Sequence, residues 1–447
     1  MTGTVPERPP IEARLRAAGL PPLARTAWLE IDVEALTANL GAIREAVGQG
    51  VRVEPVVKAD AYGHGAVPVA EILEPAGADG FSVAAFDEAV ELRAAGIRAP
   101  ILVLYPVPAE YAAEAARLGV SLTVGDERLL RRLLDRVASD GRTTRGGDGA
   151  AGEDGRPLLV QLEVETGLGR GGIDPGRVVS AARRLRATPG VRLEGAWSHL
   201  AAPGDGPRTR AQGERLERAV AALVEAGIDV PIRHLAASGG LLAAVPPLEA
   251  VRPGLAIYGL VPDGFAPSGP GRGLAAMLRP VMSLHARPVR VAELPRGWGV
   301  SYGPTFETRR PSRIATLPLG YGDGWSRTLS NQADVLVRGI RVPLVGTVAM
   351  DAVMADVTDV PGAPVTVDEE FTLLGAQGGE RIDAAELARS RNTISWEVVT
   401  AMSRRLPRVY HAAAGALGIR TLGEGKDRWL RSSSGVTPSG RSRSKRS

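Results

Sequence analysis

Short apolar runs alternate with helical stretches along the first part of this chain, and this alternation limits the possible folds more than any other feature of the sequence. Eight runs have the composition of buried strands, at 53–59, 80–84, 101–105, 121–124, 158–164, 193–199, 232–238 and 255–259. Helical patterns lie between most of them, as at 85–96 and 209–227. Eight strands that alternate with helices predict a (β/α)8 barrel, with an open doubly wound sheet as the alternative. No GxGxxG motif follows an early strand, which weakens a dinucleotide-binding interpretation.

The sequence changes character after residue 262. Strand-like runs bounded by Gly, Pro and Asp follow, at 282–294, 313–321, 333–346, 354–360 and 370–375. A helical pattern appears late, at 383–389. The expected fold class is therefore α/β, with a (β/α)8 TIM-like barrel over 26–262 and a mostly β domain over 263–425.

Three segments have compositions that are typical of disorder or flexibility. Residues 1–25 are rich in Pro and Arg, and residues 139–157 are rich in Gly and polar residues. Residues 426–447 consist largely of Ser and basic residues. We expect a disordered N-terminal extension, a flexible insertion within the barrel and a disordered basic tail.

The composition is that of a globular protein without cysteine chemistry. Hydrophobic residues make up 44% of the chain and charged residues 23%, which is enough to form a sizeable core. There are no cysteines, so disulfides, zinc–cysteine sites and thiol nucleophiles are excluded. The N-terminal residues lack the apolar run of a secretory signal, and no apolar stretch approaches the roughly 18 residues that a membrane span requires. We therefore expect a cytoplasmic protein with no membrane partner.

The positive charge is concentrated at one end of the chain. Seven basic residues and one acidic residue lie within 426–447, although the net charge of the whole chain is only +4. The rest of the chain is therefore slightly acidic. A nucleic-acid-binding protein usually carries its basic charge on a folded face, so a nucleic-acid module is a distant alternative.

A lysine lies at the end of the first candidate strand, in the string Val-Val-Lys58-Ala-Asp-Ala-Tyr62-Gly-His64-Gly. An unpaired ammonium is costly to bury, and the C-terminal ends of barrel strands carry catalytic residues. A buried lysine amine is a nucleophile that can form a Schiff base with a carbonyl cofactor. The residue pattern alone leaves open whether Lys58 does this or extends its ammonium into solvent.

This string resembles the cofactor-lysine motif of the alanine racemases, which use pyridoxal phosphate (PLP). The resemblance continues in order through most of residues 27–420. Further matching segments are Thr-Gly-Leu-Gly-Arg170, Trp-Ser-His199, His-Leu-Ala-Ala-Ser238, Arg252-Pro-Gly254-Leu-Ala-Ile-Tyr-Gly, Ser-Tyr302-Gly, Gly-Tyr321-Gly-Asp-Gly-Trp-Ser-Arg327 and Met350-Asp351. This many matches in one order make chance an unlikely explanation, although each residue alone has an ordinary structural interpretation.

The resemblance implies a role for each matching residue. Cofactor contacts are expected from Lys58, Tyr62, Arg170, His199, Ser238, Arg252, Gly254 and Trp396. Lys58 is implied to bind PLP covalently, Tyr62 and Ser238 to contact its phosphate, and Arg252 to face its pyridine nitrogen. Substrate contacts are expected from Arg170, Met350 and Asp351. No metal ligand is implied.

The implied activity is the interconversion of L-alanine and D-alanine, with Lys58 and Tyr302 as the two bases on opposite faces of the substrate. By resemblance, Lys58 takes the proton of the D-isomer and Tyr302 that of the L-isomer. A free tyrosine has a pKa near 10, so cations must stabilise its phenolate, and His199 and Arg252 are the expected sources. Tyr302 and Asp351 are implied to come from the partner subunit of a homodimer.

Three positions depart from the family pattern. Glu163 stands where the family commonly has a carbamylated lysine, Ala237 where it usually has Asn, and Trp396 where it usually has a Tyr that contacts the phosphate. A carboxylate, like a carbamate, is a planar anion, so we expect Glu163 to hold Arg170 in a bidentate pair. The alternatives are a racemase of another amino acid, a PLP enzyme of specialised metabolism on the same scaffold, and a PLP-binding protein without turnover.

Overall fold

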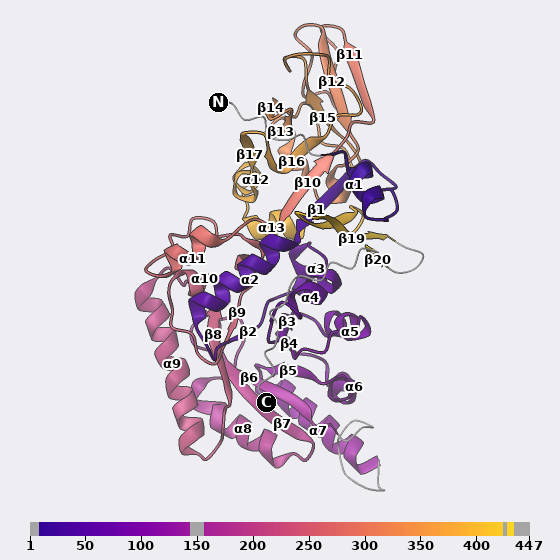
Figure 1. Ribbon diagram of the computed structural model, residues 1–447. Coiled ribbons are helices and arrows are strands. Elements are labelled where there is room, and N and C mark those ends of the chain that lie inside the picture. Colours follow the sequence, from indigo (N-terminus) through magenta and orange to yellow (C-terminus); the bar gives the residue numbers. More distant parts are fainter. Residues whose placement is uncertain (1–8, 144–155, 423–426, 433–447) are drawn as a thin grey trace, which may run out of the picture. The chain divides into compact units, whose positions relative to one another are not determined.

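The computed structural model describes residues 9–143, 156–422 and 427–432, which form two compact units (Figure 1). The barrel unit contains 37–61 and the described residues of 66–279. The sheet unit contains the described residues of 1–36, 62–65 and 280–447. Within these described ranges, no helix is both long and apolar enough to cross a bilayer.

Eight parallel strands form the barrel unit, in the order β2-β9-β8-β7-β6-β5-β4-β3. They are β2 (Arg52–Val53), β3 (Phe81–Val83), β4 (Ile101–Val103), β5 (Val120–Val124), β6 (Leu158–Glu163), β7 (Val191–Trp197), β8 (Ile232–Ala237) and β9 (Ala250–Arg252). The ring is closed beyond β2, where Val57 N donates to Ser82 O at 2.9 Å and Ser82 N donates to Pro55 O at 3.0 Å. The predicted (β/α)8 barrel is confirmed.

Helices accompany the strands of this ring, and all but the first and the last of them connect one strand to the next. They are α2 (Val33–Val47), α3 (Lys58–Tyr62), α4 (Ala66–Leu73), α5 (Phe86–Ala94), α6 (Ala112–Leu118), α7 (Glu127–Thr143), α8 (Val178–Ala187), α9 (Gly206–Glu225), α10 (Ser238–Leu242) and α11 (Gly271–Met277). Most bury one apolar stripe, as α8 does with Val178, Ala181, Ala182 and Leu185. Helix α7 extends into the expected insertion at 139–157, and 144–155 lie outside the described residues.

One of the eight expected strands is wrong. Residues 255–259 form a 3-10 turn (Leu255–Tyr258) instead of a strand, and the eighth strand is β9, directly before it. Pro253 and Gly254 end β9, and Gly259 adopts the left-handed conformation after the turn. The apolar run reflects complete burial, because all four turn residues are buried. A short buried run does not distinguish a strand from a helical turn.

The sheet unit is built on a nine-stranded sheet in the order β14-β13-β16-β10-β1-β18-β19-β20, with β17 paired to β16. Its strands are β1 (Ala27–Asp32), β10 (Met282–Ala286), β13 (Asp334–Val337), β14 (Ile340–Pro343), β16 (Phe371–Gln377), β17 (Glu380–Ile382), β18 (Arg408–Ala412), β19 (Gly415–Leu422) and β20 (Asp427–Arg431). A second sheet contains β11 (Arg290–Leu294), β12 (Ser312–Leu317) and β15 (Val353–Asp356). Helices α1 (Ile11–Ala17), α12 (Ala384–Arg391) and α13 (Ser395–Thr400) complete it.

The unit boundaries differ from the expected ones because early segments join the later sheet. Strand β1 pairs antiparallel with β10 and parallel with β18. Residues 62–65 belong to the same unit, where Tyr410 Oη donates to His64 O at 2.7 Å and Arg408 Nε donates to Gly63 O at 2.9 Å. The barrel unit in turn runs on to residue 279, beyond the expected end at 262.

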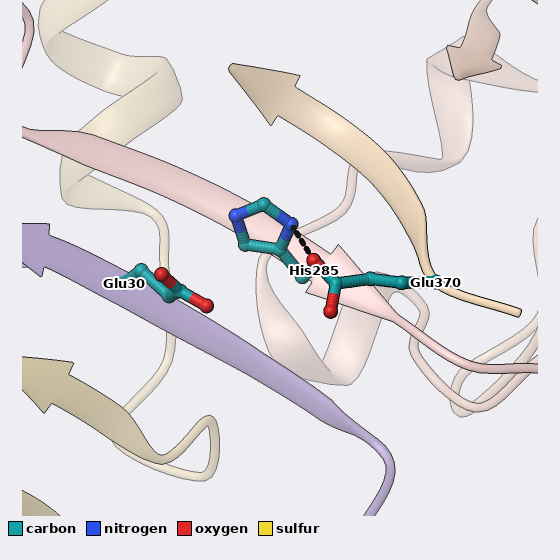
Figure 2. A group of neighbouring side chains, drawn as sticks. All are labelled: Glu30, His285 and Glu370. Carbon is teal, nitrogen blue, oxygen red and sulfur yellow. Dashed lines mark ion pairs between the residues drawn. The ribbon is translucent and has the colours of Figure 1, made fainter. Parts of the chain in front are cut away.

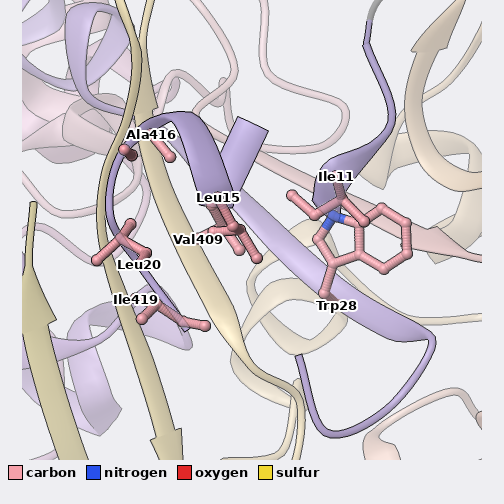
Figure 3. Packing of buried hydrophobic residues seen from close by; sticks show 8 residues of the cluster. Ile11, Leu15, Leu20, Trp28, Val409, Ala416 and Ile419 are labelled. Carbon is pink, nitrogen blue, oxygen red and sulfur yellow. The ribbon is translucent and has the colours of Figure 1, made fainter. Parts of the chain in front are cut away.

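The expectation that 1–25 lack order is wrong for residues 9–25. Ile11 and Leu15 on α1 are 1% and 0% exposed and pack with Trp28, Val409 and Ile419 (Figure 3). A charged contact adds to this packing, because the guanidinium of Arg14 donates to both carboxylate oxygens of Glu30, at 3.1 and 2.6 Å. Residues 1–8 lie outside the described residues.

The expected disordered tail at 426–447 also contains structure. Residues 427–431 form β20, which pairs antiparallel with β19 and extends the sheet by one strand. Ser432 Oγ donates to Ala18 O at 3.0 Å, next to the end of α1. Basic composition therefore did not preclude a strand, because backbone pairing needs no apolar side chain. Residues 433–447 lie outside the described residues.

We predict that Leu15→Ala destabilises the sheet unit. Leu15 is 0% exposed, so truncation leaves a cavity, and a loss of about 2–5 kcal/mol in the free energy of unfolding is expected. Arg16→Ala on the exposed face of α1 is the control, with an expected change within about 0.5 kcal/mol. Urea unfolding monitored by circular dichroism measures both. Equal stability of the two variants would show that α1 does not anchor the unit.

Candidate functional site

The expected site residues of the barrel unit gather at one rim. Lys58 follows the strand segment that closes the ring, Glu163 ends β6, and His199 follows β7. Ser238 follows β8 and Arg252 ends β9. The strands are all parallel, so these five positions lie at their C-terminal ends, where barrel enzymes place their catalytic residues.

The backbone after Lys58 forms a left-handed turn. Four consecutive non-glycine residues have φ values of 51°, 56°, 55° and 53°, at Ala59, Asp60, Ala61 and Tyr62. Left-handed conformation costs roughly 1–2 kcal/mol for each such residue, so the surrounding structure must hold the turn. Two side chains do so: Asp60 Oδ1 accepts from Ala66 N at 2.9 Å, and Glu88 Oε1 accepts from Ala59 N at 2.6 Å.

The amine of Lys58 is poised to act as a nucleophile. Burial is the main cause that lowers the pKa of Lys58, and the positive charge of Arg170 lowers it further. The carboxylate of Glu88 acts in the opposite direction and raises this pKa. A lysine whose pKa is lowered by desolvation has more of its amine in the neutral, reactive form at neutral pH.

Arg252 is buried at the centre of the rim and is held by three partners. Its Nη2 donates to Ser198 O at 2.8 Å, its Nη1 donates to His234 Nδ1, and its Cζ lies 4.7 Å from the ring centroid of Trp197. His234 Nε2 in turn contacts Gln161 Oε1 at 2.6 Å. Burial lowers the pKa of Arg252 to about 10, so the guanidinium stays charged at neutral pH.

His199 is neutral, which corrects one expectation. Burial is the main cause that lowers its pKa, to about 3, and the charges of Arg252 and Arg170 lower it further. The prediction that His199 supplies a cation for a tyrosinate is therefore wrong. Instead, its Nδ1 lies 3.5 Å from Nη2 of Arg252 and can accept a hydrogen bond from it. Arg252 remains as the permanent cation.

Ser238 offers a hydroxyl to an anion. Its Oγ accepts hydrogen bonds from the N–H groups of Gly254 and Ala256, both at 3.0 Å, and the residue is 5% exposed. These two bonds use the oxygen as an acceptor and leave the hydroxyl hydrogen to be donated. The amine of Lys58, the guanidinium of Arg252 and this hydroxyl are together the groups that an aldehyde cofactor with a ring nitrogen and a phosphate requires.

The expected bidentate pair between Glu163 and Arg170 is wrong. Glu163 points inward and is 7% exposed, but it makes no hydrogen bond to Arg170. Glu165 explains this, because its carboxylate accepts from the N–H groups of Gly167, Leu168 and Gly169 and so curls the loop before Arg170. Arg170 is exposed, and its Cζ lies 5.5 Å from the ring centroid of Tyr105.

The charges of Arg170 and Arg252 act on the carboxyl group of Glu163. Burial is the main cause that raises the pKa of Glu163, while Arg170 and Arg252 lower it. The glycines beside it leave the room that its carboxylate occupies: a Cβ on Gly125 would lie 2.7 Å from Oε2, and one on Gly171 would lie 3.2 Å from it.

The sheet unit presents Tyr302 on an exposed loop. The tyrosine is 77% exposed and lies between two residues with positive φ, Ser301 at 67° and Gly303 at 50°. Ser301 Oγ donates to Thr347 O at 2.6 Å, which ties this loop to the one that leads to Met350. The backbone at Tyr302 is therefore held in place, while its phenol group is exposed to solvent.

Met350 and Asp351 lie on that neighbouring loop of the same unit. Gly322 N donates to Met350 O at 2.9 Å, and Arg405 Nη2 donates to Asp351 Oδ1 at 2.5 Å. A Cβ on Gly320 would lie only 2.1 Å from Ala349 O, so this close approach of two loops requires glycine. Met350 is 52% exposed, and Asp351 is exposed as well.

Tyr62 and Trp396 have different environments. Tyr62 ends the left-handed turn and is 8% exposed, and burial raises its pKa to about 12. Its phenol is therefore neutral and can donate a hydrogen bond. Trp396 lies in the first turn of α13 and is half-buried.

Sequence reasoning missed four residues of the site. His234, Gln161 and Glu165 lie in strings that carry the family resemblance or directly beside them, but residue type alone assigns them no function. Glu88 stands at the third position of a helix, a pattern that indicates a helix cap and nothing more. Their contacts with Arg252, with the loop before Arg170 and with the residue after Lys58 become visible only in three dimensions.

A second cluster in the sheet unit joins Glu30, His285 and Glu370 (Figure 2). His285 Nδ1 pairs with Glu370 Oε1 at 3.1 Å. The carboxylate of Glu30 accepts from Arg14 and also from Trp28 Nε1, at 2.9 Å. A metal ion would have to displace a guanidinium from a buried carboxylate, so we assign this cluster to the anchoring of α1.

Two family models match this chain. The model described as alanine racemase, N-terminal domain, matches residues 31–262, and the model described as alanine racemase, C-terminal domain, matches residues 281–410. An alanine racemase of Symbiobacterium thermophilum is 43% identical over 390 residues, which cover 86% of this chain and 97% of that protein. An alanine racemase of Halothermothrix orenii is 36% identical over 399 residues, which cover 88% of this chain and 99% of that protein.

Solved structures are similar over the same extent. The crystal structure of alanine racemase from Bacillus anthracis with bound L-Ala-P is similar to this chain, with a TM-score of 0.78 and 33% sequence identity. The matched residues cover 89% of this chain and 98% of the Bacillus anthracis chain. The structure of an alanine racemase from Clostridium difficile 630 has a TM-score of 0.79 and 28% sequence identity. The matched residues cover 90% of this chain and 99% of the Clostridium difficile chain. The similarity therefore extends over both units.

We predict that the left-handed turn after Lys58 makes glycine the more stable residue at position 59. Ala59 is exposed and has φ 51°, so Ala59→Gly should relieve roughly 1–2 kcal/mol of conformational strain in the folded state. The greater conformational entropy of glycine in the unfolded chain offsets about 0.4–1 kcal/mol of this gain. Ala59→Val, with its β-branched side chain, is expected to destabilise the turn. Thermal unfolding measures both variants. A more stable valine variant would contradict the left-handed backbone.

We predict that Glu163→Gln stabilises the fold more at pH 8 than at pH 4. Burial raises the pKa of Glu163. The wild type therefore loses stability as the pH rises from the unfolded-state pKa of about 4.3 towards the higher folded-state pKa. The glutamine variant has no such loss. Melting temperatures at both pH values measure the effect, and Glu214→Gln, at an exposed carboxylate, is the control. A difference that does not depend on pH would mean that Glu163 is not a buried carboxylate.

Proposed function

Because this chain belongs to the alanine racemase family, whose members depend on PLP, we propose that it interconverts L-alanine and D-alanine. The observation that carries the proposal is the half-buried amine of Lys58 at the same barrel rim as Arg252, with a pKa that is lowered by desolvation and also by the charges of Arg170 and Arg252. That pair supplies one proton-transfer group and one fixed cation in the same site.

The residues at the rim fit PLP. Bound PLP supplies an electron sink that acidifies the α-hydrogen of an amino acid. Lys58 would hold the aldehyde carbon, Arg252 would face the pyridine nitrogen, and Ser238 and Tyr62 would donate to the phosphate. Gly254 would contribute through Ser238, to which its N–H donates. Neutral His199 would lie near the ring, and Arg170 would be available to the phenolic oxygen or to the substrate.

Two proton-transfer groups are needed, one on each face of the substrate. The Nζ of Lys58 holds or releases a proton on one face, and the Oη of Tyr302 does so on the other. Arg252 retains its own proton, because its pKa of about 10 lies well above neutrality. It therefore donates a hydrogen bond without protonating a ring nitrogen, which disfavours transamination relative to racemisation.

The site is proposed to form in a homodimer. Tyr302 is 77% exposed, and Met350 and Asp351 are exposed on the loop to which Ser301, next to Tyr302, donates a hydrogen bond. A catalytic base needs a site that excludes water, so a second copy of the chain would cover these residues with its barrel rim. Tyr302 and Asp351 of one subunit would then act at Lys58 of the other. The protein is proposed to work in the cytoplasm.

The substrate is proposed to be alanine, and a larger amino acid is the alternative. Trp396 motivates the alternative, because it is half-buried and bulkier than the tyrosine expected there. A panel of L-amino acids distinguishes the two. If Trp396 contacts the cofactor or the substrate, Trp396→Tyr shifts the ratio of alanine turnover to turnover of larger substrates.

We predict that Tyr302→Phe and Lys58→Ala both abolish racemisation but differ in the step that they lose. Loss of a general base costs about 10²–10⁴-fold in rate. Tyr302→Phe should still bind PLP and should slowly exchange the α-hydrogen of D-alanine in deuterated water. Lys58→Ala should lose the covalent link to PLP and its visible absorption. Tyr111→Phe, at another exposed tyrosine, is the control. Equal and undiminished exchange of both isomers in Tyr302→Phe would refute the assignment.

A further inference from the structure

Glu88 has contacts that the proposed function does not yet explain. It lies in the first turn of α5, and its carboxylate accepts hydrogen bonds from three backbone N–H groups. Oε1 accepts from Ala59 N at 2.6 Å, and Oε2 accepts from Ala84 N at 2.8 Å and from Ala85 N at 3.0 Å. One side chain thus joins the segment after β3 to the residue that follows Lys58.

We propose that Glu88 is a positioning residue for Lys58: its carboxylate fixes the backbone that carries the lysine and supplies the anion that balances the lysine's positive charge. The inference rests on the proposed function, because it assigns a purpose to Glu88 only if Lys58 is the cofactor lysine.

The contact with Ala59 goes beyond the capping of a helix. A capping glutamate at the third helical position needs only the N–H of the residue before the helix, which here is Ala85. The bond to Ala59 reaches a different segment of the chain, at the first residue of the left-handed turn. A strained turn has several ways to relax. A hydrogen bond at its first residue therefore restricts the backbone next to Lys58 and, with it, the direction in which the Lys58 side chain points.

The charge of Glu88 is the only acidic influence on Lys58 among the groups that act on it in the described structure. Burial, Arg170 and Arg252 all lower the pKa of Lys58, and Glu88 alone raises it. His199 is neutral near pH 7, since its pKa is about 3. A base that both takes and returns a proton needs a pKa close to the working pH. Glu88 therefore limits how far the surrounding cations lower the pKa of Lys58.

A matched control lies in the same barrel. Glu74 directly follows α4 and accepts from the backbone N–H groups of Arg98 at 2.9 Å and Ala99 at 2.6 Å. It therefore has the same kind of structural role as Glu88, a carboxylate that holds a loop, but it does not appear among the charges that act on Lys58. Glu74→Gln reports what the loss of such a structural carboxylate does by itself.

The test compares Glu88→Gln, Glu88→Asp and Glu74→Gln with the wild type in three measurements. The first is the rate at which the PLP-free protein captures PLP, followed by visible absorption between pH 5 and 9. The second is the hydrogen exchange of the Ala59 amide in the PLP-loaded protein. The third is the racemisation of alanine, as kcat and KM over the same pH range.

Glu88→Gln removes the charge, so the pH midpoint of PLP capture should fall by about 0.5 unit or more, a threefold shift in the protonation equilibrium. Glu88→Asp keeps the charge but is one methylene shorter. Its midpoint should stay at the wild-type value, while the Ala59 amide exchanges at least tenfold faster. Glu74→Gln should change neither quantity. If Glu88→Gln does not fold, Glu88→Asp still tests the positioning through Ala59.

An unchanged midpoint in Glu88→Gln, or unchanged Ala59 exchange in Glu88→Asp, overturns the inference and leaves Glu88 as a helix cap. The same shift in Glu74→Gln also overturns it. The racemisation assay separates this result from the proposed function. A wild type that captures PLP but does not racemise alanine refutes the proposed function, whereas the PLP-capture and exchange data still decide the role of Glu88.

Discussion

The closure of the parallel ring determines where every group of the barrel rim stands. Two hydrogen bonds between the segment 55–57 and Ser82 complete the ring, and Lys58 is the next residue along the chain. Because all strands run in one direction, closure brings the ends of β6, β7, β8 and β9 to the rim that carries the lysine. The backbone hydrogen bonds of the ring, rather than any side-chain pair, therefore assemble the chemistry from segments far apart in sequence.

The alternation of apolar runs and helices predicted the barrel and seven of its strands. It failed at 255–259 because a fully buried turn has the same apolar composition as a buried strand. Composition also failed at residues 9–25, where polar and Pro-rich flanks surround the few residues that are buried, chiefly Ile11 and Leu15. Such sparse anchors carry no periodic signal. The pairing of β1 with β10 and β18 joins residues hundreds of positions apart, which no local pattern reveals.

The sequence predicted the positions of the charged groups better than their protonation states. Arg252 was expected as a fixed cation, and its burial at 2% exposure is consistent with that role. His199 and Glu163 were expected to be charged partners, but burial opposes the charged form of each. Desolvation depends on everything that surrounds a side chain, so a sequence motif that places a residue does not specify its protonation. The same limit applies to Glu88, whose partners are backbone amides from two separate segments.

The position of β1 within its sheet has a consequence for the order in which the protein is made. Five of the six residues of β1 are buried between strands that follow it much later, and Asp32 is paired with His411. Asp32 and Arg408 are 376 positions apart, so at 5–20 residues per second β1 leaves the ribosome roughly 20–75 s before β18. The barrel segments from 37 to 279 are complete well before then and can fold first. The nascent chain can pair one edge of β1 with β10, but the other edge must wait for β18, so the first strand of the described structure is one of the last to be paired on both sides.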